Sequence, residues 1–116
     1  MPVRSLNSSV LRWPGKEEVE KAFREWAREQ KARYPDTLRI GYFGSYARAS
    51  WSVGSDLDII VVVSTSSKPF HERSRDFDAT DLPVPADILV YTEEEFQKLK
   101  GRFARMLEEE TIWVIP

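Results

Sequence analysis

The segment from Asp56 to Val63 constrains the fold more than any other stretch of this sequence. It reads Asp-Leu-Asp-Ile-Ile-Val-Val-Val, and its second half is apolar at every position and mostly β-branched. Strands with this pattern are covered on both faces, as in the middle of a sheet. We therefore expect a central strand here, with its polar residues confined to its start.

Two segments have the periodicity of amphipathic helices, residues 16–33 and residues 93–109. Pro35 ends the first helix, and Gly101 weakens the second. Thr92 and Glu95 have the spacing of a capping box at the start of the second helix. The apolar positions that we expect in the core are Val19, Ala22, Phe23, Trp26 and Ala27 in the first helix, and Phe96, Leu99, Phe103, Met106 and Leu107 in the second.

The rest of the chain predicts three more strands, at 38–43, 86–91 and 111–115. We expect a short helix over 46–49, a turn over 52–55, and an irregular segment over 64–85 with a short helix near 71–77. Residues 1–14 have no clear period and are expected to form an irregular arm. This order predicts an α+β (α/β) fold, a mixed β-sheet flanked by helices.

Composition limits the classes of protein that the chain can belong to. Its 116 residues fit a single domain, residues 1–116. Lys and Arg number 17 against 19 Asp and Glu, a net charge of −2, which argues against strong nucleic-acid binding. The absence of cysteine excludes disulfides and thiolate metal sites. Because no apolar run is long enough for a membrane span and the start lacks a secretory signal, we expect a cytoplasmic domain and no membrane partner.

Gly44 and Ser45 stand between a predicted strand and a predicted short helix. Free backbone N–H groups and the helix dipole favour a phosphate at such a place. Gly44 lets an anion approach the backbone closely, and the Ser45 hydroxyl can donate to the same anion. The sequence thus predicts a phosphate-binding turn at Gly44-Ser45.

Asp56 and Asp58 lie two residues apart on the predicted central strand, so both side chains leave the same face. Two carboxylates this close repel each other, and one of them should have a raised pKa unless a cation is bound. Oxygen ligands favour Mg²⁺. A neighbouring strand could bring Asp87 alongside as a third carboxylate. Three acids, a phosphate-binding turn and Mg²⁺ are the components of phosphoryl or nucleotidyl transfer.

At these residues the sequence resembles the minimal nucleotidyltransferases of the DNA polymerase beta superfamily. The family signature is Gly-Ser, ten residues, Asp-x-Asp and a later third acid; here Gly44-Ser45 is followed by residues 46–55 and then by Asp56-Leu57-Asp58. The pattern alone should arise by chance on the order of once in a thousand chains of this length. One departure is Ala49, which stands where the family usually has glycine after Arg48.

The resemblance implies a role for each matching residue. Gly44 and Ser45 would hold the β- and γ-phosphates of a nucleotide, with Arg48 facing the phosphates or the acceptor. Asp56, Asp58 and Asp87 would bind Mg²⁺, two ions in all, and Asp87 would also help to deprotonate an attacking hydroxyl. The nucleotide would be ATP or another nucleoside triphosphate. Small members of the family often pair with HEPN-domain toxins, and some transfer AMP to a toxin tyrosine.

Several residues have a plainer interpretation as well. Asp87 could be a partly exposed strand acid, and Arg48 could form a surface salt bridge. His71, the only histidine, is expected to be a solvated residue without a catalytic role. Trp51 could stack on a base or simply pack.

Three functions remain open from the sequence. The first is transfer of a nucleoside monophosphate, AMP from ATP, to a hydroxyl of a HEPN-type partner protein with release of pyrophosphate. The second is a non-catalytic antitoxin that blocks its partner by contact. The third is transfer to a small hydroxylated molecule, which is harder for a short chain because a dedicated pocket needs walls.

Overall fold

A computed structural model describes residues 14–48, 50, 52 and 54–116. The predicted arm over residues 1–14 lies outside the described residues except for Pro14, and so do Ala49 and Trp51. No helix in the described part of the chain is long and apolar enough to cross a membrane.

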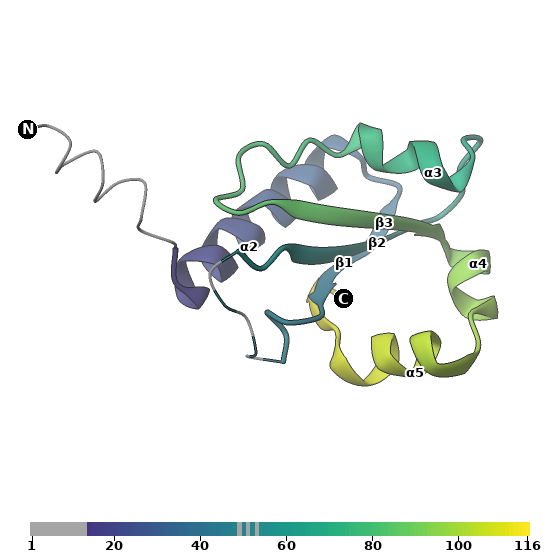
Figure 1. Cartoon of the computed structure of the whole chain (residues 1–116). Helices are drawn as coiled ribbons and strands as arrows, with labels where there is room; N and C mark the ends of the chain where they lie inside the picture. Colours follow the sequence, from purple (N-terminus) through teal and green to yellow (C-terminus); the bar gives the residue numbers. More distant parts are fainter. Residues whose placement is uncertain (1–13, 49, 51, 53) are drawn as a thin grey trace, which may run out of the picture.

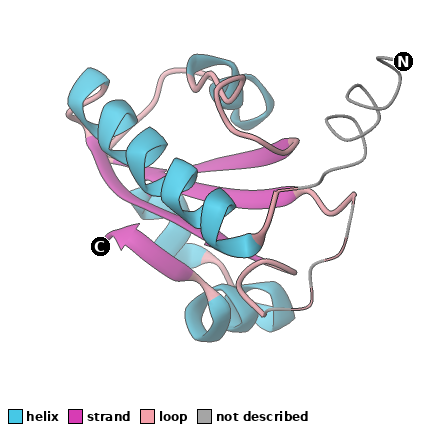
Figure 2. Cartoon of the chain, turned by 90° about the vertical axis from the view of Figure 1, so that its left-hand side faces the viewer, coloured by secondary structure: helices cyan, strands magenta, loops and turns pink. Residues whose placement is uncertain are grey.

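The described residues build one four-stranded mixed sheet with helices on both faces (Figures 1 and 2). The strands are β1 (Thr37–Phe43), β2 (Leu57–Val63), β3 (Ala86–Thr92) and β4 (Ile112–Ile115), in the order β3-β2-β1-β4. β2 is antiparallel to β1 and parallel to β3, and β4 is antiparallel to β1. The α+β class predicted from the sequence is confirmed.

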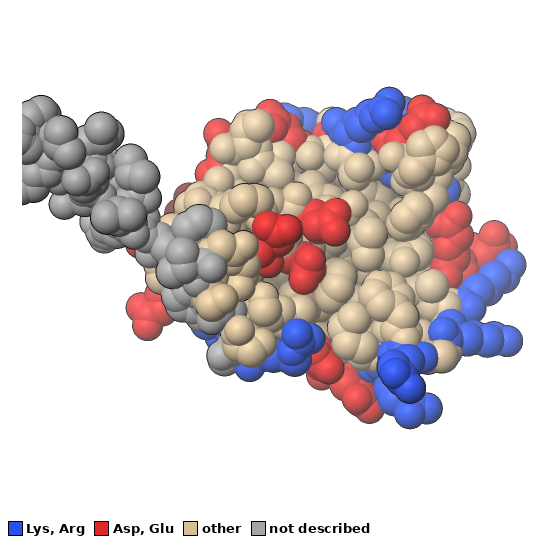
Figure 3. Space-filling model, viewed as in Figure 1, with Lys and Arg blue, Asp and Glu red and all other residues tan. Residues whose placement is uncertain are grey.

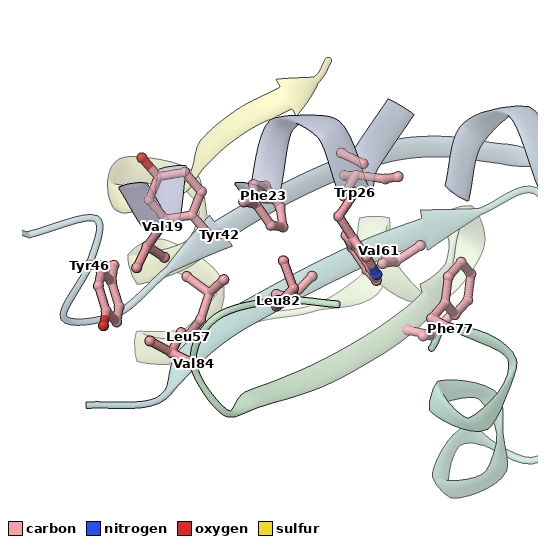
Figure 4. Packing of buried hydrophobic residues seen from close by; sticks show 14 of the residues in the cluster. Val19, Phe23, Trp26, Tyr42, Tyr46, Leu57, Val61, Phe77, Leu82 and Val84 are labelled. Carbon is pink, nitrogen blue, oxygen red and sulfur yellow. The ribbon is translucent and has the colours of Figure 1, made fainter. Parts of the chain in front are cut away.

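Helix α2 (Lys16–Arg33) has the predicted bounds and lies across one face of the sheet (Figure 2). Its stripe of Val19, Phe23 and Trp26 is buried against alternate residues of β1 and β2, such as Tyr42 and Val61 (Figure 4). Full burial of one such side chain contributes about 1.5–3 kcal/mol to folding. This side of the sheet therefore holds the larger hydrophobic core.

The polar segment between β2 and β3 also contributes to this core, which the sequence pattern did not predict. It contains α3 (Phe70–Arg73) and a 3₁₀ turn, η1 (Ser74–Asp76), near the place where a short helix was expected. Phe77, Leu82 and Val84 beyond them are buried against α2 and the sheet (Figure 4). Trp26 Nε1 donates a 2.7 Å hydrogen bond to the Asp78 carbonyl, which ties this segment to α2.

The opposite face of the sheet packs against α4 (Glu93–Lys98) and α5 (Gly101–Glu110). The single helix predicted over 93–109 is wrong, because the chain leaves helical geometry at Leu99 and resumes at Gly101 with φ +87°. The predicted capping box of Thr92 and Glu95 is present. The break also changes the expected core, since Leu107 is buried whereas Phe103 is 37% exposed.

Candidate active site

The acidic residues singled out in the sequence meet where β2 and β3 begin. β2 starts at Leu57, so Asp56 immediately precedes the strand and Asp58 lies within it. In the parallel pairing of β2 and β3, Asp58 is the direct partner of Asp87. Direct partners on neighbouring strands point to the same face of the sheet, and neighbouring strands lie about 4.8 Å apart. The two carboxylates therefore lie side by side. Figure 3 shows acidic side chains gathered over the beginnings of these strands.

The electrostatics of Asp58 show that the three acids and Arg48 influence one another. The pKa of Asp58 is raised, first by burial and then by the negative charges of Asp87 and Asp56, while the positive charge of Arg48 opposes the rise. Asp58 is half-buried, whereas Asp56 and Asp87 are exposed. The prediction that one of the crowded carboxylates has a raised pKa is confirmed for Asp58. Burial, and not repulsion between the acids, is the largest cause.

The turn that follows β1 lies directly against Asp58. Gly44 is buried and has φ +77°, a conformation that favours glycine. A Cβ atom at this position would collide with Asp58 Oδ2. The glycine thus allows the backbone of the turn to approach the Asp58 carboxylate, whereas the close approach of a phosphate that the sequence predicts at Gly44 stays a prediction.

The short helix predicted over 46–49 is wrong for its described residues, which form turns after Gly44. The Arg48 N–H donates to the Gly44 carbonyl at 3.0 Å, but the Ser50 N–H reaches back five residues to Ser45 at 2.9 Å, so a regular helix does not continue. Tyr46 is completely buried beside Leu57 and Val84 and fixes the turn to the core (Figure 4). A phosphate bound here would therefore meet the backbone N–H groups of a turn and not the N-terminus of a helix.

Arg48 connects the site to α5. Its Nη1 lies 3.1 Å from Glu110 Oε1, in an ion pair in which the Arg48 side chain is half exposed. Glu110 could not be identified from the sequence, because 62 residues separate it from Arg48 and no motif marks it. His71 lies on α3 with an exposed side chain 3.5 Å from Glu72, in keeping with its predicted solvated character.

The donor chemistry of the acidic cluster suits a hard divalent cation, since the three side chains offer only carboxylate oxygens. A bound cation would also relieve the repulsion that raises the pKa of Asp58. Among the described residues, no three His, Cys, Asp or Glu side chains are already arranged as a closed metal-binding group. The fit to a divalent cation therefore rests on the chemistry of the carboxylate donors and on the repulsion among them.

A glycine turn lies against paired strand carboxylates on a mixed sheet flanked by helices, as expected for the family that the sequence resembles. The sequence model of the nucleotidyltransferase domain matches residues 19–114. The chain therefore belongs to the nucleotidyltransferase domain family and is a nucleotidyltransferase. Comparison with curated proteins finds no match.

Solved structures share this fold at low sequence identity. A proposed nucleotidyltransferase from Sulfolobus solfataricus superposes with a TM-score of 0.63 at 19% identity, over 84% of this chain and 80% of that one. A toxin–antitoxin complex with AMP-PNP gives a TM-score of 0.53 at 16% identity, over 87% and 73%. A mutant of the toxin–antitoxin pair MntA–HpeT gives 0.50 at 14% identity, over 87% and 72%.

Proposed function

We propose that this chain is a Mg²⁺-dependent nucleotidyltransferase that moves AMP from ATP to a hydroxyl of a partner protein, a HEPN-domain toxin. The observation that carries the proposal is the register of β2 and β3, which sets Asp58 directly beside Asp87. The negative charges of Asp87 and Asp56 support it, because they create a place that favours a cation; they add to burial, the larger cause, in raising the pKa of Asp58. Two solved structures with this fold are toxin–antitoxin complexes, one of them with AMP-PNP.

Each residue of the site has a part in the proposed reaction. The Gly44-Ser45 turn binds the β- and γ-phosphates, and Arg48 adds a positive charge beside them. Asp56, Asp58 and Asp87 hold the metal ions. When bound, Mg²⁺ supplies positive charge that neutralises the phosphates and the departing pyrophosphate.

The proposed reaction forms one bond and breaks one bond, and it needs no other reactant. The acceptor oxygen forms a bond to the α-phosphorus of ATP, and the bond from that phosphorus to the pyrophosphate oxygen breaks. Asp87 accepts the proton of the acceptor hydroxyl, since it is the most exposed of the paired strand acids. Positioning and charge stabilisation supply most of the rate.

The proposal is tested with ATP labelled in the α-phosphate and the protein that co-purifies with this chain. We expect Mg²⁺-dependent transfer of label to that protein, and mass spectrometry should find an added AMP on a side-chain hydroxyl. Asp58→Asn should reduce the rate about 100-fold. Asp81→Asn is the matched control, because Asp81 is an exposed acid outside the cluster, and its rate should stay within about twofold of the original.

Other outcomes identify the two competing functions. Undiminished transfer by Asp58→Asn would remove the assigned site. No transfer at all, together with full neutralisation of the partner by the Asp58→Asn variant, would show an antitoxin that acts by contact. Label found only on small molecules would show a small hydroxylated acceptor.

A further inference from the structure

A cavity of about 270 Å³ lies between the sheet and the α4–α5 pair. Its walls include Phe96, Leu99, Leu107 and Trp113, and its charged residues are Arg39 and Glu108. The guanidinium of Arg39 lies over the Trp113 ring, 3.8 Å from its centroid, and 5.5 Å from the centroid of Phe96. The cavity thus combines apolar walls with a cation held flat against an indole.

The backbone of β1 makes this arrangement possible. Gly41 is buried within the strand, and a Cβ atom there would come within 2.9 Å of Trp113 Cε3 and 2.7 Å of the Ile112 carbonyl oxygen. A side chain at position 41 would therefore displace the indole from its place over β1. Phe96 also contacts Trp113 edge to face, with ring centroids 5.9 Å apart and planes at 86°. The Arg39 stack is consequently fixed in place before any ligand binds.

The N–H groups of Arg39 are available to a ligand. Its contacts within the described part of the chain are the two ring stacks, and no ion pair or hydrogen bond to its guanidinium is found there. Stacking leaves the edges of the guanidinium open, and its planar fork matches a carboxylate. Arg39 is therefore a preorganised donor for an acidic group.

A run of cations lies at the corner where α4 meets α5, between three glutamates at 93–95 and three more at 108–110. Residues 96–107 contain four cations and no acid, in a chain whose net charge is −2. The four are Lys98, Lys100, Arg102 and Arg105, and all are exposed. Figure 3 shows Lys and Arg side chains projecting at this corner, on the same side of the molecule as the acidic gathering over β2 and β3. The charges of Arg39 and Glu108 cancel within the cavity. The net electrostatic attraction for an acidic partner therefore comes from the four cations at the corner.

The same surface adjoins the candidate active site. Phe103 of α5 is 37% exposed and makes an edge contact with Phe43, with ring centroids 6.1 Å apart. Phe43 in turn is the register partner of Asp58. A protein seated on the α4–α5 corner would therefore lie beside the acidic cluster.

We propose that the α4–α5 corner and the Arg39 cavity form the docking surface for an acidic segment of the protein that accepts the nucleotide. This surface holds the acceptor through carboxylate contacts to Arg39 and the corner cations and through apolar contacts to Phe103. This proposal rests on the proposed function, because it requires that the acceptor of the nucleotide is a protein. The charge separation across this side of the molecule would orient the acceptor, with its acidic segment at the corner and its hydroxyl toward the cluster.

The observations favour an acidic protein over a nucleic acid. Arg39 already stacks on one face of Trp113, so that face of the ring is not free to stack on a base. The four corner cations lie within residues 98–105 of a net-negative chain, whereas a phosphate backbone is usually bound along an extended basic surface. The apolar cavity walls suit side chains rather than phosphates.

The docking surface is tested by fluorescence anisotropy with a labelled random copolymer of glutamate and tyrosine, at low ionic strength and without nucleotide or divalent cation. The comparison probes are a lysine–tyrosine copolymer and polyadenylate RNA. The variants are Lys100→Glu with Arg102→Glu, and Arg39→Gln. The matched control reverses two exposed cations on α2, Lys21→Glu with Arg28→Glu.

We expect the original chain to bind the glutamate–tyrosine copolymer better than either comparison probe, with binding that weakens as salt is added. Reversal at the corner and Arg39→Gln should each weaken it about tenfold, and the α2 control should change it less than about twofold. Equal weakening by the α2 control, no measurable binding, or tighter binding of the RNA would overturn the proposal.

The experiments distinguish failure of the docking surface from failure of the proposed function. Asp58→Asn should bind the copolymer as the original chain does, because Asp58 lies outside the docking surface. Binding with these variant effects but no label transfer would count against the proposed function alone. Transfer to a partner protein that is unaffected by reversal at the corner would count against the docking surface alone.

Discussion

At the scale of single residues, the ion pair between Arg73 and Glu95 links several elements of the fold. Arg73 is buried and donates to both carboxylate oxygens of Glu95, at 2.5 and 3.1 Å, and also to the Val90 carbonyl. The hydrogen bonds from Arg73 and from the Thr92 N–H, together with the Arg73 charge, lower the pKa of Glu95 from 4.5 to about 2. This one carboxylate therefore joins α3, β3 and the capping box of α4.

Replacing Glu95 should give a stability change that depends on pH. Because the pKa of Glu95 is lower in the folded chain, its stabilising effect is complete above pH 4.5 and is lost as pH falls from 4.5 toward 2. Glu95→Gln should lower the free energy of unfolding by about 1 kcal/mol at neutral pH, a modest value because the Glu95 side chain is 41% exposed. Urea unfolding of both proteins across this pH range measures the difference.

Glu94→Gln is the matched control, since Glu94 is an exposed acid on the same helix whose only ion pair in the described structure is a 3.7 Å contact with Lys98. It should change stability by less than about 0.5 kcal/mol at any pH. A Glu95→Gln penalty that persists undiminished near pH 2 would show that the Arg73 pair is not its source.

At the scale of secondary-structure elements, local patterns predicted what depends on local sequence. The bounds of α2 and the buried run of β2 follow from periodicity and composition within each segment. The burial of Phe77, Leu82 and Val84 did not, because it depends on packing against α2 from a polar segment distant in sequence. The same holds for the register that pairs Asp58 with Asp87, which the sequence allowed but could not fix.

The break between α4 and α5 shows how one backbone angle redirects an apolar stripe. Gly101 has φ +87° and open space around its Cβ position, so conformation rather than crowding selects glycine there. Gly101→Ala should destabilise the chain by about 1 kcal/mol, because alanine is strained at positive φ. Thermal or urea unfolding measures this.

Gly101→Asn provides the comparison, because asparagine tolerates the left-handed conformation better than alanine does. We expect it to cost less than Gly101→Ala. Stabilisation by alanine would mean that residues 93–110 prefer one continuous helix, in which case the α4–α5 corner described above would not exist.

At the scale of the whole molecule, the larger core lies on one side of the sheet and the predicted acidic site lies on the other. The face against α2 holds the larger cluster of buried side chains. The opposite face carries Asp58 and Asp87 at one place and the Arg39 cavity at another. Figure 3 shows acidic side chains and basic side chains at separate places on this side of the molecule. The motif predicted the acids and the glycine turn, whereas the Arg48–Glu110 pair and the corner could be found only in the folded chain.

The central claim is that Asp56, Asp58 and Asp87 form one divalent-cation site beside the Gly44 turn. The most direct measurement is a titration with Mn²⁺, followed by electron paramagnetic resonance, in the presence of AMP-PNP. We predict that the original chain and Asp81→Asn bind Mn²⁺ together with the nucleotide, and that Asp58→Asn and Asp87→Asn each bind it at least about tenfold more weakly. Binding by Asp58→Asn and Asp87→Asn that equals binding by the original chain would contradict the claim.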